Sequence, residues 1–320
     1  MTCLFLIISK SNIYINHLML NKYIFFVIII LCFTPFFSPP LALLAGIAFS
    51  IILKNPFQKN TKKATSYLLQ SSIVCLGFGM NLFKSLQTGK EGIFFTIITV
   101  FGVLALGIVV GKILKVESKL TYLISVGTSI CGGSAIAAIS PIIKADNQEI
   151  SISIGTVFIL NALALLIFPF IGNYFNLTQH QFGLWAAIAI HDTSSVVGAA
   201  SVYGKEALEI ATIVKLTRAL WIIPLAVIST FIFKNNSNKI YIPWFILFYI
   251  LAMLSNTFIS IPIQFSELMV FLGKKGLTVS LFLIGSGIST EMLKKVGFKP
   301  FLLGVILWFV ISLVSLIVII

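Results

Sequence analysis

Three short stretches of the chain place polar or charged residues inside long apolar runs. The first is "SVGTSICGGSAIAA" (Ser125–Ala138), in which two adjacent glycines are flanked by small polar side chains. Glycine lowers helix stability by roughly 1 kcal/mol relative to alanine, so we expect a helix break at Gly132-Gly133. A break inside a membrane offers backbone amides or carbonyls to a ligand. The candidate substrate-binding residues here are Thr128, Ser129, Cys131, Gly132, Gly133 and Ser134. The alternative is close helix packing, which also favours small residues.

The second stretch, "AIAIHDTSSVVGAAS" (Ala187–Ser201), contains an adjacent histidine and aspartate. Ionisable residues inside a membrane are costly and face the bundle interior or a water-filled path. His191, Asp192 and Thr193 are therefore candidates for binding a substrate or carrying a coupling ion. The alternative is an interfacial segment in which His191 and Asp192 meet water at a loop.

The third stretch, "ATIVKLTRALWIIP" (Ala211–Pro224), contains Lys215 and Arg218, which is the only arginine of the chain. Residues three apart share one face of a helix. Two positive charges on one buried face require a counter-charge, either a bound anion or a carboxylate such as that of Asp192. The alternative is that both long side chains reach back to the headgroups.

Composition identifies the environment in which these residues act. The chain has 320 residues, of which 58% are hydrophobic and only 10% charged. Soluble domains have about 25% charged residues, so we expect an integral membrane protein with all-α, polytopic architecture. The formal charge of +13 fits loop lysines that set topology and contact anionic lipids. The sequence has no basic patch with interleaved aromatic residues, so it does not suggest nucleic-acid binding.

The sequence does not indicate an enzyme. Cys3, Cys32, Cys75 and Cys131 have no metal-ligand spacing and form no evident disulfide framework. No activated nucleophile, phosphate loop or zinc motif is recognisable. We therefore expect no catalytic residues, no metal and no cofactor.

Apolar runs predict about eleven transmembrane segments. Their expected ranges are Tyr23–Phe37, Leu41–Leu53, Ser66–Leu82, Ile93–Leu114, Leu120–Ile143, Ser151–Phe175, Phe182–Ala200, Leu208–Phe233, Ile242–Phe258, Leu268–Ser289 and Phe298–Ile320. Most loop lysines fall on one side when the N-terminus is cytoplasmic and the C-terminus outside. Because this orientation requires an odd number of crossings, the segments after the first divide into two blocks of five with opposite topology, as in inverted-repeat transporters.

The predicted organisation follows from that division. Residues 1–22 form an N-terminal tail in which Met19 is a candidate true start, and residues 23–37 form an extra first span. Residues 41–175 form the first five-helix repeat and residues 182–320 the second. Broken helices at mid-membrane are expected within this arrangement.

Several of these stretches resemble a known family. "VGTSICGGSAIAAISPIIKA" (Val126–Ala145), "FGLWAAIAIHDTSSVVGAAS" (Phe182–Ser201) and "IATIVKLTRALWIIP" (Ile210–Pro224) are together similar to the YeiH-like bacterial membrane proteins, also called sulfate exporters. The likeness extends over residues 20–320. Gly133 and Ser194-Ser195 depart from the family pattern, which has alanine and alanine-glutamine there. The family is distantly similar to cation/proton antiporters and bile-acid transporters, which implies inverted repeats with crossing broken helices.

The resemblance and the pattern together favour a secondary transporter that exports a small anion, such as sulfate or an organosulfur or carboxylate compound. Two alternatives remain open: a cation/proton antiporter that uses Asp192, and a membrane protein without transport activity. The expected partners are the anion, a coupling proton or sodium ion and the lipid bilayer, with a homodimer as one candidate assembly. The expected location is the bacterial inner (plasma) membrane.

Overall fold

The computed structural model describes residues 19–34, 36–53, 55–233, 244–259, 261–287 and 296–320. Within these ranges every regular element is a helix, as the apolar composition predicts. The helices are Met19–Cys32, α2 (Pro39–Leu53), α3 (Gln58–Gly77), α4 (Leu82–Ile113), α5 (Ser118–Ser129), α6 (Gly133–Ile139), α7 (Asn147–Tyr174), α8 (Gln179–Ala189), α9 (Thr193–Tyr203), α10 (Lys205–Ala219), α11 (Ile222–Ile232), α12 (Trp244–Phe258), α13 (Ile263–Gly287) and α15 (Phe298–Ile319). The tail over residues 1–18 lies outside the described residues.

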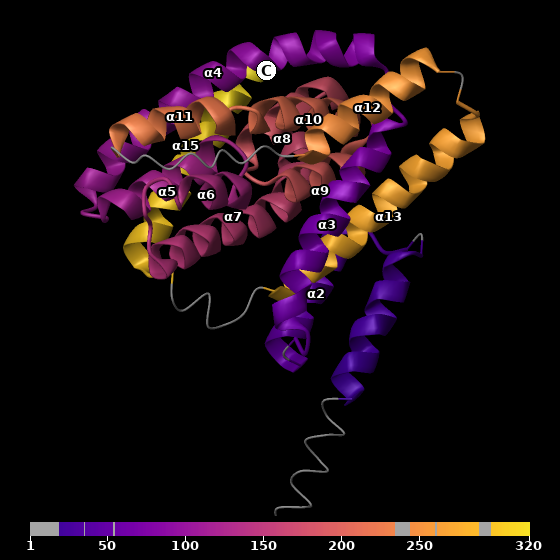
Figure 1. The fold of residues 1–320 in the computed structure, drawn as a ribbon, viewed down its shortest axis with the longest axis horizontal. Helices are drawn as coiled ribbons and strands as arrows, with labels where there is room; N and C mark the ends of the chain where they lie inside the picture. Colours follow the sequence, from indigo (N-terminus) through magenta and orange to yellow (C-terminus); the bar gives the residue numbers. More distant parts are fainter. Residues whose placement is uncertain (1–18, 35, 54, 234–243, 260, 288–295) are drawn as a thin grey trace, which may run out of the picture.

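The helices form two groups that are visible in Figure 1. The larger group contains α4 to α11 and α15, which pack around one another. In the smaller group, α13 packs along α2 and α3, and α12 packs against α3. Helix α9 joins the groups because it contacts both α13 and α2. Gly198 lies at this junction, where an added Cβ would be 2.9 Å from Cδ1 of Leu281.

Glycines allow the helices of the smaller group to approach closely. Gly46 of α2 and Gly285 of α13 cross so tightly that a Cβ at Gly46 would collide with the backbone oxygen of Phe282. A Cβ at Gly285 would likewise collide with the backbone oxygen of Leu43. The first helix, Met19–Cys32, is attached to this group where Lys275 Nζ of α13 donates a hydrogen bond of 2.6 Å to Thr34 O.

Several described helices are suited to a bilayer by length and composition. Five are long and apolar enough to cross it: Phe95–Ile113, Gln148–Tyr174, Lys205–Ile232, Ile263–Gly287 and Phe298–Ile319. Shorter apolar helices cover Met19–Cys32, Pro39–Leu53 and Phe245–Phe258. A multi-pass membrane protein follows from this set, whereas the count of eleven crossings remains a prediction.

Some boundaries differ from those expected from hydropathy. Helix α4 begins at Leu82 rather than near Ile93, so its first turns are more polar than a membrane span. The expected segment Leu208–Phe233 is divided into α10 and α11 at Leu220 and Trp221. Pro224 explains this division because proline has no N–H to donate to the carbonyl one turn earlier.

The interruptions of two other segments are the main feature of the larger group. The run that begins at Leu120 is broken between α5 and α6, and the run that begins at Phe182 is broken between α8 and α9. These breaks occur in the fourth segment of the first predicted repeat and in the first segment of the second. They are therefore not equivalent under that division, and the repeats at 41–175 and 182–320 remain predictions.

Candidate functional site

The first break is set by the backbone of Gly132. Its φ of +65° is in the left-handed region that glycine adopts readily. Helix α5 ends at Ser129, and α6 begins at Gly133, immediately after this residue. Gly132 N donates to Gly127 O at 2.9 Å, while Gly132 O accepts from Ile136 N at 3.2 Å. The expected break at Gly132-Gly133 is thus present.

The second break is organised by the side chain of Asp192. Its Oδ2 accepts hydrogen bonds from Ser194 N at 3.1 Å and Ser195 N at 3.3 Å, and also from Ser194 Oγ. Asp192 is therefore the N-cap of α9, where a carboxylate satisfies free amides and favours the positive helix end. Thr193 is the first residue of α9 and is buried.

Asn161 of α7 connects α7 to this second break. Its Oδ1 accepts from His191 N at 3.1 Å and from Asp192 N at 3.3 Å. These two amides belong to the residues between α8 and α9, where the helix cannot satisfy them. Asn161 is not among the site residues expected from the sequence. Its only signal is an isolated polar residue in an apolar span, which is also typical of ordinary helix packing.

The two breaks lie against each other. A Cβ built on Gly132 would be 3.6 Å from Cα of Asp192 and 3.6 Å from Nδ2 of Asn161. The polar stretches that are distant in sequence are therefore adjacent in the fold. Helices α5, α6, α7, α8 and α9 all contribute backbone or side chains to this region, which we call the crossing.

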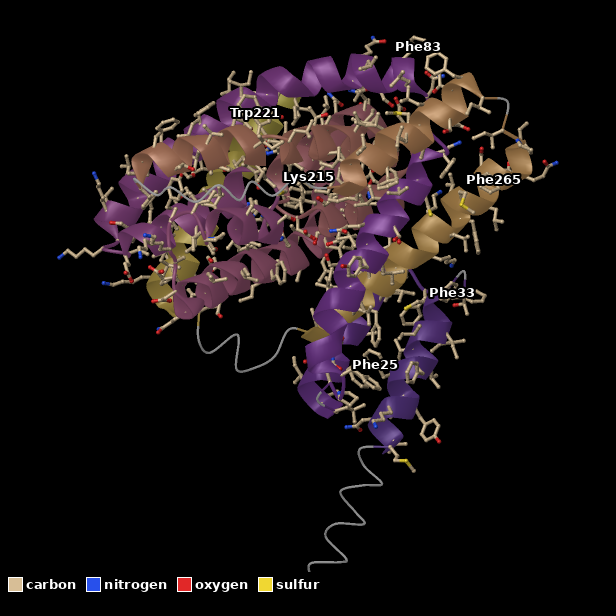
Figure 2. All side chains as sticks on the ribbon, viewed as in Figure 1. Phe25, Phe33, Phe83, Lys215, Trp221 and Phe265 are labelled. Carbon is tan, nitrogen blue, oxygen red and sulfur yellow. The ribbon has the colours of Figure 1, made fainter. Side chains whose placement is uncertain are left out.

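Lys215 and Arg218 of α10 extend into the crossing and are fully buried, with 0% exposure each. Lys215 Nζ donates to Ile190 O at 2.7 Å and to Ala187 O at 3.4 Å. Figure 2 shows Lys215 in the interior of the larger helix group. Because the side chain is buried, it does not reach back to the headgroups.

Arg218 links the two broken helices directly. Its Nε donates to Ser129 O at 2.8 Å, and its Nη1 donates to Ile188 O at 3.0 Å. The sequence predicts a carboxylate or a bound anion as the counter-charge of Lys215 and Arg218. Their hydrogen-bond partners among the described residues are instead carbonyl oxygens at the C-terminal ends of α5 and α8. Those ends have partial negative charge, so both cations stabilise them.

The formal charges at the crossing do not cancel. Lys215 and Arg218 bring two positive charges, and Asp192 brings one negative charge. The crossing also contains buried polar atoms without a hydrogen-bond partner among the described residues. These atoms are Thr128 Oγ1, Asn161 Nδ2, His191 Nδ1 and Nε2, and Arg218 Nη2. Most of them can donate a hydrogen bond, so the region is suited to an acceptor-rich anion.

The other predicted residues differ in how they contribute. Cys131 is buried and hydrogen-bonded to Ser134, and it lies within electrostatic range of Lys215. Ser134 itself is exposed, and Gly133 faces the ring of Phe158. The hydroxyl of Ser129 donates to Val126 O at 3.1 Å, so this residue meets Arg218 through its carbonyl rather than its side chain.

Comparison with known proteins places the chain in a family. A UPF0324 membrane protein of Bacteroides thetaiotaomicron is 54% identical over 87% of this chain and 85% of its own. Similar proteins of Porphyromonas gingivalis (52%; 89% of this chain, 87% of its own) and Bdellovibrio bacteriovorus (46%; 93% of each) have the same name. No solved structure matches. These relatives confirm the resemblance to the YeiH-like proteins. Because the model of the family described as conserved hypothetical protein 698 matches residues 18–304, the chain belongs to that family of membrane proteins.

Proposed function

We propose that the protein is a secondary transporter that exports a small anion across the bacterial inner membrane and binds it at the crossing. The N-terminus would be cytoplasmic and the C-terminus outside. The proposed substrate is sulfate or an organosulfur or carboxylate compound, and the coupling ion is a proton or sodium. The observation that supports this proposal is that two fully buried basic side chains, Lys215 and Arg218, lie against the ends of two interrupted helices.

The electrostatic argument rests on Lys215 and Arg218. A buried charge costs several kcal/mol unless it is compensated. The carbonyl ends of α5 and α8 compensate part of this charge, and the carboxylate of Asp192 compensates another part. An anion bound beside Arg218 Nη2, which has no hydrogen-bond partner in the described part of the chain, would complete the balance.

The helix breaks provide the second argument. Irregular backbone at membrane depth is tolerated where it is buried in protein or lines a cavity, and transporters use such breaks for substrate and ion sites. In this chain the breaks at Gly132 and Asp192 touch each other in the interior of the larger helix group. That position is consistent with a site that becomes accessible from alternate sides when the helix groups move.

The alternative of a cation/proton antiporter centred on Asp192 has less support. The carboxylate oxygen Oδ2 of Asp192 accepts from two backbone amides and from one hydroxyl. A coupling ion would therefore compete with the cap of α9. The same residue would also have to bind a cation close to Lys215, with which it interacts electrostatically.

Counterflow in proteoliposomes tests the proposal. Purified protein is reconstituted, loaded with unlabelled anion and supplied with labelled sulfate, thiosulfate, taurine or succinate outside. We expect accumulation of at least one label above that in protein-free liposomes. Arg218→Gln should abolish it, whereas Lys274→Gln, which removes the same charge from an exposed position of α13, should not. Accumulation no greater than in empty liposomes for all four compounds would refute the proposal.

A further inference from the structure

The side chain of Asn161 has a role at the crossing beyond helix packing. It is a polar side chain within the apolar part of α7, is only 3% exposed, and lies beside both breaks. Its carbonyl and amide ends face different surroundings. The carbonyl oxygen accepts from His191 N and Asp192 N, whereas the amide nitrogen Nδ2 has no hydrogen-bond partner within the described ranges.

The hydrogen bonds fix the orientation of this amide. The oxygen and nitrogen of an asparagine are assigned from their partners. Two backbone N–H groups donate to this side chain, and only its oxygen can accept them, so the NH₂ group points away from those two amides. It points toward the first break, because Nδ2 is 3.6 Å from the position of a Cβ on Gly132. Because Gly132 has no side chain, no Cβ atom of this residue lies against Asn161 Nδ2.

An unpaired buried donor is unfavourable by about 1–3 kcal/mol, and such groups in native structures call for an explanation. Arg218 Nη2 and Thr128 Oγ1 are likewise buried without a hydrogen-bond partner among the described residues. Arg218 reaches the residue after Thr128 by donating to Ser129 O, and α5 packs against α7. Three helices that meet around the breaks, or bond to them, thus each carry one such donor.

We infer that Asn161 is a substrate-binding residue that also positions the second break. Nδ2 donates a hydrogen bond to an oxygen of the transported oxyanion, while Oδ1 holds the amides of His191 and Asp192. This inference rests on the proposed function and adds to it a residue and a selectivity rule. An amide NH₂ group only donates hydrogen bonds. The site therefore prefers anions whose oxygen atoms can accept a hydrogen bond at the crossing.

Asn161→Asp separates the two roles of the side chain. Aspartate keeps an acceptor for His191 N and Asp192 N but has no NH₂ donor. Asn161→Ala removes both the acceptor and the donor. Ala162→Asp is the charge control, because it adds the same negative charge one residue along α7, on a different face of the helix.

The experiment measures sulfate affinity from the rise in unfolding temperature of each detergent-solubilised variant, because a ligand that binds the folded state stabilises it. Without sulfate, Asn161→Asp should unfold close to the wild-type temperature and Asn161→Ala below it. With sulfate, Asn161→Asp should bind at least about tenfold more weakly, as expected for loss of a hydrogen bond to a charged ligand. Ala162→Asp should retain most of the wild-type affinity.

The outcomes distinguish this inference from the proposed function. A wild-type protein that sulfate does not stabilise would contradict both. Two outcomes would refute the role of Nδ2 without contradicting the proposed anion site. In one, sulfate stabilises Asn161→Asp as much as the wild-type protein. In the other, sulfate stabilisation is lost equally in Asn161→Asp and Ala162→Asp. Loss in Asn161→Asp alone supports it.

Discussion

The backbones of Gly132 and Asp192 lie side by side, so that a Cβ added to the glycine would be 3.6 Å from Cα of the aspartate. Each residue lies in the interruption of a different helix, so the two breaks form one structural unit. Arg218 reinforces this unit because it donates to the last residues of both α5 and α8.

The left-handed backbone of Gly132 predicts that Gly132→Ala is destabilising. With φ of +65° and ψ of −125°, Gly132 is in a region that L-residues rarely adopt, at a cost of about 1–3 kcal/mol, and the new Cβ would also lie 3.2 Å from Cγ1 of Val157. We expect a lower unfolding temperature in detergent. Gly102→Ala in α4 is the matched control, because its Cβ would meet nothing within 4 Å, and it should be neutral or stabilising. Equal unfolding temperatures for the two variants would contradict a strained Gly132.

The two hydrogen bonds donated by the Arg218 guanidinium predict that lysine cannot replace this residue. The guanidinium donates to Ser129 O and Ile188 O from two nitrogens in fixed geometry, whereas an ammonium is a single point donor. Arg218→Lys should therefore leave one buried carbonyl unpaired and destabilise the protein by about 1–3 kcal/mol. Arg218→Gln should be at least as unstable, because it also removes the charge. Thermal unfolding provides the measurement, with Lys274→Arg as the control on the exposed face of α13. A wild-type unfolding temperature for Arg218→Lys would show that the bridge is dispensable.

Sequence alone predicted the break near Gly132-Gly133, because adjacent glycines among polar residues are unfavourable in a membrane helix. It also placed Lys215 and Arg218 on one buried face, because a spacing of three defines a helix face without reference to the fold. The membrane class followed from the low content of charged residues. The first two conclusions depend on local sequence and the third on overall composition, and none of them requires the tertiary structure.

The partners of those residues could not be predicted in the same way. Lys215 and Arg218 bind carbonyls that are free only because α5 and α8 end beside α10, which is a property of the tertiary structure. The cap formed by Asp192 depends on where α9 begins, and the contact of Gly132 with Asp192 depends on how α5 and α8 pack. Asn161 was missed because one asparagine in an apolar span has the same sequence signal whether it packs or binds.

The charge balance at the crossing predicts the effect of Asp192→Asn on anion binding. Asparagine can still cap α9 through its side-chain oxygen, so the loss of stability should be smaller than for Asp192→Ala, where removal of a cap costs about 0.5–2 kcal/mol. The variant removes a negative charge near Lys215 that would repel a bound anion. The affinity for sulfate should therefore rise by about tenfold. The rise in unfolding temperature with sulfate measures it. Weaker sulfate binding in folded Asp192→Asn would instead favour a carboxylate that participates in binding or coupling.

The occupied carbonyls predict that transport does not require sodium. Carbonyl groups at the C-terminal ends of half-helices are the groups that coordinate sodium in many transporters. Here Ser129 O and Ile188 O accept from Arg218, and Ile190 O accepts from Lys215. The two side chains thus provide the positive charge that a sodium ion would otherwise bring, which favours a proton as the coupling ion. We expect equal rates of labelled-anion counterflow when sodium is replaced on both sides by potassium or choline. A rate that falls with sodium removal and recovers when sodium is restored would show that a sodium site exists despite these contacts.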